Sequence, residues 1–95
     1  MYGTVAIAKV KRENREKLIE VMRGYQGLGV AGFRRSQVLF PEGQEDGCIL
    51  AVWFEDRESY RRNADDPAQH QRYLEYRALM EADPEWHDGE WLDLS

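Results

Sequence analysis

The chain has 95 residues and a formal net charge of −5, with 42% hydrophobic and 12% aromatic residues. This length suits one domain over residues 1–95, and the aromatic content is typical of a folded globule. The negative charge disfavours nucleic acid and anionic membranes as partners. No apolar run approaches the roughly 18 residues of a membrane span, and no signal peptide is recognisable. We therefore expect a cytoplasmic protein that does not bind membranes.

The first predicted element is a strand over Tyr2–Val10, which is rich in small and β-branched residues. The run Val5–Ala8 is apolar on both alternating faces, which predicts a central strand covered on two sides. A helix should follow from Asn14, a residue type common at N-caps, to about Gly24–Gly27. Its apolar stripe at helical spacing consists of Leu18, Val21, Met22 and Tyr25.

A second strand is predicted over Val30–Phe40, and the polar run Arg34–Gln37 within it favours an edge position. Residues Pro41–Gly47 have loop composition, so the next strand should be the other arm of a hairpin. That strand, Gly47–Phe54, is apolar on both alternating faces. It is therefore predicted to be central, like the first strand.

Two helical segments follow the third strand. Asp56 is predicted to cap a short helical turn that reaches Tyr60. The sequence Asp65-Asp66-Pro67 should end this turn and begin a second helix, because Asp is a good cap and Pro suits the first helical position.

The second helix is predicted to reach Ala82, where Asp83-Pro84 ends it, and Gly89–Leu94 to form the last strand. The order strand-helix-strand-strand-helix-strand predicts an α+β, ferredoxin-like two-layer sandwich with the first and third strands in the middle. The helices can cover only one face of this sheet. The other face then needs a second subunit or a ligand, and we expect a homodimer.

Four segments together resemble a known family, and the resemblance covers nearly the whole chain: Tyr2–Ala6, Val52–Tyr60, Ala64–Pro67 and Glu81–Glu90. The family is the antibiotic-biosynthesis-monooxygenase-like family of the dimeric α+β barrel superfamily, and the last segment looks like an actinobacterial-type branch. The resemblance implies homodimers whose sheets form a barrel, with a pocket in each subunit between sheet and helices. Family members include cofactor-independent oxygenases of aromatic polyketides, haem-degrading enzymes and small isomerases.

Three residues are candidates for catalysis. His70 could accept a proton from a phenolic substrate, because imidazole titrates near neutral pH. Asn63 could orient oxygen or a substrate carbonyl, since an amide both donates and accepts hydrogen bonds. Tyr73, on the same helical side as His70, could donate to a developing negative charge. Each also has a plain structural interpretation, as a solvated helix residue or as an amide that satisfies backbone groups at the helix break.

The candidate substrate-binding residues are three aromatics and one cation. Phe33, Trp53 and Tyr60 could form an aromatic pocket wall, although a small core also needs such residues without any ligand. Arg34 and Arg35 should point to opposite faces of an edge strand, so that one of them, taken as Arg35, could bind an anionic or carbonyl oxygen. The alternative is a charged edge that prevents aggregation.

Neither a metal nor a cofactor is expected. The single cysteine, Cys48, lies in the buried run and is predicted to be a core residue. The two histidines, His70 and His87, lack spaced partners for a metal site. By its resemblance to this chain, the haem-degrading branch has Trp at the position of Asn63 and its iron-ligating His at that of Tyr73. Haem degradation is therefore not expected, although Tyr can ligate haem iron.

We therefore expect a cofactor-independent monooxygenase, or a related isomerase, that acts on a small aromatic compound between sheet and helices. The alternative is a non-catalytic dimeric module that binds a small molecule or serves in a stress response. Some RNA-binding domains share this order of elements, but their third strand exposes aromatic rings that stack on bases. Residues Cys48–Leu50 stand at those places here, and the chain is acidic, so RNA binding is not expected.

Overall fold

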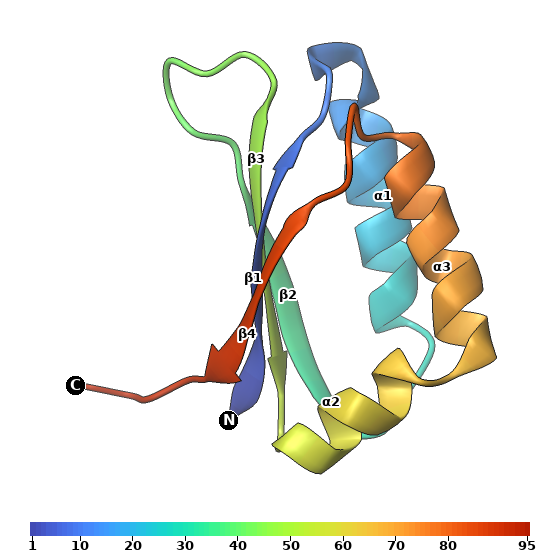
Figure 1. Cartoon of the computed structure of the whole chain (residues 1–95), viewed down its shortest axis with the longest axis vertical. Coiled ribbons are helices and arrows are strands. Elements are labelled where there is room, and N and C mark those ends of the chain that lie inside the picture. The colour runs from blue at the N-terminus through green and yellow to red at the C-terminus, as the bar shows by residue number, and fades with distance from the viewer.

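Four antiparallel strands form one sheet, and the helices lie on one side of it (Figure 1). The computed structural model describes residues 1–95, and its strands are β1 (Tyr2–Lys9), β2 (Phe33–Leu39), β3 (Gly47–Phe54) and β4 (Glu85–Glu90). The helices are α1 (Arg15–Gln26), α2 (Arg57–Ala64) and α3 (Pro67–Ala78), with a 3₁₀ turn at Arg12–Asn14. This is the α+β, ferredoxin-like two-layer architecture that the sequence predicts.

The strand order β2-β3-β1-β4 confirms that the first and third strands are central. β1 pairs with β3 along its whole length, from Tyr2 opposite Phe54 to Lys9 opposite Gly47. The edge strands β2 and β4 are the polar ones, and every residue of β4 is exposed. Polar edge strands resist pairing with the edges of other sheets. The polarity of each strand therefore matches its place in the sheet.

The core lies between the sheet and the helices. It consists of alternate residues of β1 and β3, one stripe of α1, and residues next to these elements: Ala6, Ala8, Val10, Leu18, Met22, Cys48, Leu50 and Met80. Cys48 is 1% exposed and not in a disulfide, which confirms that it is a core residue. Burial raises the pKa of the Cys48 thiol to about 11, and Arg15 offsets part of this rise. The side chain is therefore protonated at neutral pH and is a poor nucleophile.

Helix α1 begins where the sequence predicts, but Asn14 does not cap it with its side chain. The chain enters α1 through the 3₁₀ turn, so Asn14 has helical backbone angles rather than the extended ones of an ordinary N-cap. Its Nδ2 instead donates to the carbonyl oxygen of Leu79, at 3.3 Å. This hydrogen bond joins the start of α1 to the end of α3.

Helix α3 is shorter than predicted, because it ends at Ala78 rather than Ala82. Met80 leaves the helix to pair with Val10 beyond the end of β1, and its side chain is buried in the core. Arg77 donates to the Met80 carbonyl oxygen at 3.1 Å and to Asp83 Oδ1 at 2.7 Å, so it satisfies groups just past the helix end. Long-range pairing therefore decides this boundary against local helix propensity.

The last strand is also displaced, since it covers Glu85–Glu90 rather than Gly89–Leu94. Its antiparallel register places Glu90 opposite Tyr2, the first residue of β1. Trp91 N–H still donates to the Met1 carbonyl oxygen, at 2.7 Å, and beyond it β1 offers no further residue to pair with. The strand therefore ends where its partner begins.

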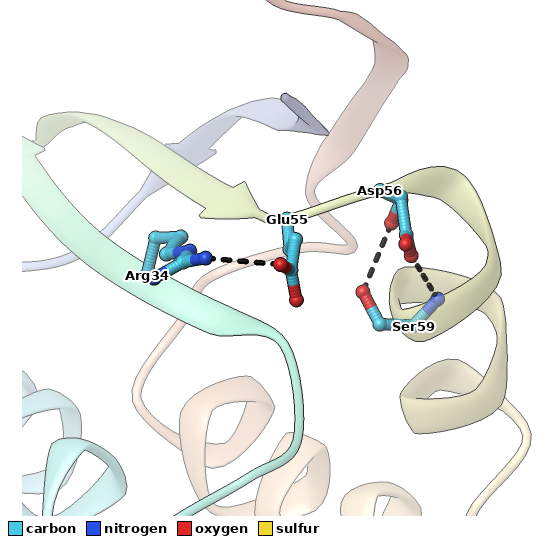
Figure 2. Close-up of polar contacts among 4 residues, drawn as sticks. All are labelled: Arg34, Glu55, Asp56 and Ser59. Carbon is cyan, nitrogen blue, oxygen red and sulfur yellow. Dashed lines mark hydrogen bonds and ion pairs between the residues drawn. The ribbon is translucent and has the colours of Figure 1, made fainter.

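Helix α2 begins as predicted at Asp56 and extends beyond Tyr60 to Ala64. Figure 2 shows its first turn, in which Asp56 Oδ1 accepts from Ser59 N–H at 2.8 Å and Ser59 Oγ donates to the Asp56 carbonyl oxygen at 3.0 Å. Gly32, with φ of 80°, packs against Ser59 from the segment before β2. A Cβ at position 32 would lie 2.4 Å from the Ser59 Cβ, so this junction requires glycine.

The face of the sheet opposite the helices, called here the outer face, bears no helix (Figure 1). Its apolar residues alternate with the core residues of the same strands: Val5, Ile7, Leu39, Ile49, Ala51 and Trp53. Ile7 is 47% exposed and Leu39 58% exposed. Trp91 stacks on Trp53 with ring centroids 4.5 Å apart. No helix in the structure has the length and apolar character needed to cross a membrane.

Candidate functional site

A cavity of about 450 Å³ lies between the sheet and the helices. The residues that line it from the sheet are Thr4, Phe33, Ser36, Leu50, Val52, Phe54, Trp86 and Asp88. Those from the helical layer are Met22, Tyr25, Tyr60, Asn63, Ala64, Gln69, His70, Tyr73, Tyr76 and Met80. The volume is in the range of small-molecule sites, and an aromatic wall with a few polar groups is typical of them.

The cavity brings together five of the residues that the sequence singles out. Tyr60 and Asn63 come from α2, His70 and Tyr73 from α3, and Phe33 from β2. Asp56 and Asp66 cap the two helices with their side chains, so the caps fix where these side chains enter the cavity. The break between α2 and α3 thus gathers the predicted candidates around one space.

Two predicted substrate-binding residues, Trp53 and Arg35, do not line the cavity. Both lie on the outer face, where the Arg35 guanidinium sits 4.9 Å from the Trp53 ring centroid. A register shift between Phe33 and Arg35 places Phe33 opposite Phe54 and Arg35 opposite Trp53. Arg34 forms an ion pair with Glu55 at 3.1 Å (Figure 2). Neither arginine is therefore placed to bind a ligand in this cavity.

Tyr25 lies at the helical side of the cavity, near Arg72, Asn63 and Tyr76. Burial raises the pKa of the Tyr25 hydroxyl, while the Arg72 charge and the nearby Asn63 amide offset part of the rise. The Arg72 guanidinium lies 5.2 Å from the Tyr25 ring centroid, and its Nε donates to Gln69 Oε1 at 3.0 Å. Burial likewise raises the pKa of Tyr76 to about 12. Both hydroxyls keep their protons at neutral pH, so this side offers hydrogen-bond donors.

A second polar group lies where the sheet meets α2. Tyr60 Oη donates to Asp88 Oδ1 at 2.9 Å. The pKa of Tyr60 is raised well above its ordinary value, first by burial and then by the Asp88 carboxylate, and the nearby Thr4 hydroxyl offsets part of the rise. Thr4 is 3% exposed, and its Oγ1 has no hydrogen-bond partner of ordinary geometry. Buried hydroxyls are usually paired, so this one needs an explanation.

His70 and Tyr73 flank the cavity from consecutive turns of α3. His70 is exposed, while Tyr73 is half-buried. The Tyr73 ring lies 6.0 Å from the Trp86 ring of β4, between centroids. A planar ligand in the cavity would therefore contact aromatic side chains, with an imidazole, an amide and a phenol within the same wall.

No group of three or more His, Cys, Asp or Glu side chains is arranged to hold a metal ion in the chain. The polar residues of the cavity wall are amides, hydroxyls, one imidazole and one carboxylate. Sequence reasoning missed Thr4, Tyr25 and Asp88. The predicted last strand begins after Asp88, and the helical spacing of Tyr25 indicates a core residue.

Solved structures with the same fold include a cofactor-independent oxygenase and several candidate antibiotic biosynthesis monooxygenases. SnoaB, a cofactor-independent oxygenase from Streptomyces nogalater, is 16% identical, with a TM-score of 0.79 over 98% of this chain and 94% of that one. A candidate antibiotic biosynthesis monooxygenase from Nitrosomonas europaea is 18% identical, with a TM-score of 0.72 over 98% of this chain and all of that one. A similarly named protein from Chloroflexus aurantiacus is 17% identical, with a TM-score of 0.74 over 99% and 95%.

No protein-family model matches the sequence, and no curated protein matches it at a significant level. The structural neighbours are thus the antibiotic-biosynthesis-monooxygenase-like proteins that the sequence resembles, and this chain has their ferredoxin-like α+β fold. At these identities the likeness is one of fold.

Proposed function

We propose that the protein is a cofactor-independent monooxygenase that acts on a small aromatic compound in the cavity between the sheet and the helices. The observation that carries the proposal is the wall of this cavity, where His70, Asn63 and Tyr73 meet beside aromatic rings. The fold of the chain is that of a cofactor-independent oxygenase, which supports the same conclusion. A fold alone hosts many activities, so the site residues are the decisive part of the argument.

Without a cofactor, the substrate itself must supply the electrons that reduce oxygen. In the proposed reaction His70 takes a proton from a phenolic substrate, and the resulting anion is electron-rich enough to react with O₂. A methylene group of the substrate becomes a carbonyl group, one oxygen atom enters the product, and the other leaves as water with the two methylene hydrogens. The four electrons that O₂ accepts come from that carbon, so no external reductant is needed.

The other polar groups hold the reacting atoms. The Asn63 amide can donate to the substrate carbonyl or to oxygen, since it lies beside the Tyr25 hydroxyl in the same wall. Tyr73 can donate to the enolate oxygen as negative charge develops, which favours the transition state over the ground state. The Arg72 guanidinium over the Tyr25 ring adds positive charge on this side.

The test is oxygen consumption by the purified protein with a panel of phenolic anthrones and naphthols, followed by mass spectrometry with ¹⁸O₂. Incorporation of one labelled oxygen atom is expected. His70→Ala should lower the rate by about 10²–10⁴, the usual contribution of a general base. His87→Ala is the matched control, because His87 lies on β4 opposite Val5 and does not line the cavity. Equal rates in the two variants would remove His70 from the mechanism, and an absence of oxygen uptake across the panel would favour a binding module.

We further propose that the protein is a homodimer that pairs through the outer face. This face presents a continuous apolar row, because Leu39 and Ile7 both lie opposite Ile49 in neighbouring strands. Monomeric proteins rarely leave large contiguous apolar patches in water. A two-fold axis through the sheet would cover the same patch on both copies at once.

A further inference from the structure

A row of residues with polar side chains crosses the floor of the cavity. In the sheet register Ser36 and Thr4 both lie opposite Val52, and Thr4 lies opposite Asp88. All four residues line the cavity, and three of the four are polar. The rows on either side contribute apolar side chains, among them Leu50, Phe54 and Trp86. The polar row is therefore a local feature of an otherwise apolar floor.

The hydrogen bonds at one end of this row leave an excess of acceptors. Tyr60 has a single proton and gives it to Asp88 Oδ1, so its oxygen can otherwise only accept. The Asp88 carboxylate accepts and never donates when it is ionised. The Thr4 hydroxyl is the remaining donor nearby: its buried Oγ1 lies beside the Tyr60 hydroxyl but makes no hydrogen bond of ordinary geometry. A group that both donates and accepts would complete this set.

We infer that Thr4, Tyr60 and Asp88 form a subsite that binds a neutral hydroxyl group of the ligand. The ligand hydroxyl donates to Asp88 or Tyr60 and accepts from Thr4. The Asp88 carboxylate disfavours carboxylate, phosphate or phenolate oxygens at this end, because like charges in direct contact repel each other, although solvent at the exposed Asp88 weakens the repulsion. The inference rests on the proposal that the cavity binds the substrate, and it determines the orientation of that substrate.

The orientation follows from the contrast between the two sides of the cavity. The side near Tyr25 offers donors and the Arg72 charge, so it suits a carbonyl or anionic oxygen. The side near Asp88 offers acceptors, so it suits a hydroxyl group. A substrate with both groups would place its carbonyl end toward the helices, near Asn63, and its hydroxyl end on the sheet.

Binding of two bicyclic ketones tests the subsite without any need for turnover. The probes are 6-hydroxy-1-tetralone and 6-methoxy-1-tetralone, which differ in the ability to donate a hydrogen bond at the end distant from the carbonyl. Titration calorimetry at pH 6.5 keeps the hydroxyl protonated. The wild-type protein should bind the hydroxy compound about tenfold more tightly, the usual effect of one hydrogen bond to a charged acceptor. Equal affinities for the two probes, or no binding of either, would overturn the inference.

Three variants test which residues cause the preference for the hydroxy compound. Asp88→Asn and Tyr60→Phe should each reduce the tenfold preference to about twofold or less, while Tyr2→Phe should retain it. Tyr2 is the matched control, since its ring lies 5.3 Å from the Tyr60 ring but does not line the cavity. A tenfold preference that survives in Asp88→Asn would overturn the assignment. The oxygen-consumption assay is separate, so that result would leave the proposed oxygenase activity standing.

Thr4→Val tests whether Thr4 binds the ligand or only supports the fold, because the two roles predict different effects on ligand affinity. The variant removes an unpartnered buried hydroxyl at nearly constant volume, so the ligand-free protein should unfold at a higher temperature than wild type. The same variant should lose affinity for both probes, because the hydroxyl and methoxy oxygens can each accept from Thr4, and it should retain the tenfold preference for the hydroxy compound. A gain in stability together with a loss of hydroxyl binding supports the subsite. A loss of stability, or unchanged hydroxyl binding, would contradict the role of Thr4.

Discussion

The protonation states of the buried tyrosines decide what the cavity can bind. Burial raises the pKa of Tyr25, of Tyr76 and of Tyr60, and the Asp88 carboxylate raises that of Tyr60 further. All three therefore remain neutral phenols at any pH at which the protein would function. What distinguishes them is where the proton goes, because that of Tyr60 is already donated to Asp88. Tyr25 thus belongs to the donor side of the cavity and Tyr60 to the acceptor side.

The buried thiol of Cys48 should make the protein less stable at alkaline pH. Its folded-state pKa of about 11 lies above the ordinary value of 9.0. The unfolded chain therefore loses this proton first as the pH rises, so the contribution to stability is complete below pH 9 and is lost toward pH 11. The expected loss is about 1 kcal/mol between pH 8 and pH 10.

Urea denaturation at pH 8, 9 and 10 measures this loss, and Cys48→Ala is the comparison variant. Both proteins contain the same tyrosines, so the difference between their pH profiles isolates the thiol. The variant should be less stable at pH 8, because it leaves a small cavity, and its free energy of unfolding should fall less with pH. Parallel profiles for the two proteins would show that Cys48 does not titrate in this range.

The residues that line the cavity were only partly predictable from the sequence. The helix break at Asp65-Asp66-Pro67 is visible in the sequence, because Asp caps helices and Pro begins them. Four of the lining residues lie close to this break: Tyr60, Asn63, His70 and Tyr73. Thr4 gave no such signal, because a threonine in an apolar strand fits strand propensity well. Its special position depends on the strand beside it, which only the three-dimensional pairing reveals.

At the scale of elements, the junction before α2 positions half of the proposed site. Tyr60 and Asn63 lie one helical turn apart on this short helix, and an eight-residue helix has little stability of its own. The Asp56 cap and the contact between Gly32 and Ser59 therefore hold α2 at the end of the sheet. Loss of the cap should disturb the cavity as well as the fold.

Asp56→Ala should lower the free energy of unfolding at neutral pH, because it removes the side chain that caps α2. Hydrogen bonds from Ser59 lower the pKa of the Asp56 carboxyl. Its contribution is therefore present above the unfolded-state pKa and is lost as the pH falls through the folded-state pKa. Urea denaturation at pH 7 and pH 3 should show a deficit that shrinks at the lower pH.

Two further variants separate the cap from the charge of Asp56. Asp56→Ser should restore most of the stability, because serine also accepts from the backbone N–H of the first turn. Asp65→Ala, at the other end of α2, should have little effect or a slightly favourable one, since a negative charge is unfavourable at a helix C-terminus. A loss in Asp65→Ala as large as that in Asp56→Ala would point to net charge rather than capping.

The elements themselves were predictable wherever local signals and pairing agreed. The central positions of β1 and β3 follow from apolar residues on both faces, and the start of α3 follows from Asp66 and Pro67. The boundaries after α3 were wrong because pairing with β1 outweighs local propensity. Residues 91–94 look more like a strand than residues 85–90, but β1 pairs with the latter and leaves only one backbone hydrogen bond, from Trp91 N–H to the Met1 carbonyl oxygen, for the former.

At the scale of the whole molecule, the two faces of the sheet differ in what covers them. One face carries the core and the cavity, and its side chains come from even-numbered positions of β1 and β3, such as Ala6 and Leu50. The outer face carries the odd-numbered positions, which are nearly as apolar although no helix covers them. Single residues test this division directly, because neighbours in one strand belong to opposite faces.

The homodimer should therefore dissociate when a charge is placed on the outer face. Ile49→Lys puts an ammonium group between Ile7 and Leu39, where an interface would bury it against apolar side chains, so the variant should be monomeric or largely unfolded. Leu74→Lys is the matched control, since Leu74 is exposed on α3 and lies on the helical side. Light scattering at micromolar concentration should give the mass of a dimer for wild type and for Leu74→Lys. Obligate interfaces bury about 2,000 Å² or more. A wild-type mass of one chain, or an Ile49→Lys variant that remains dimeric, would show that the outer face is not the interface.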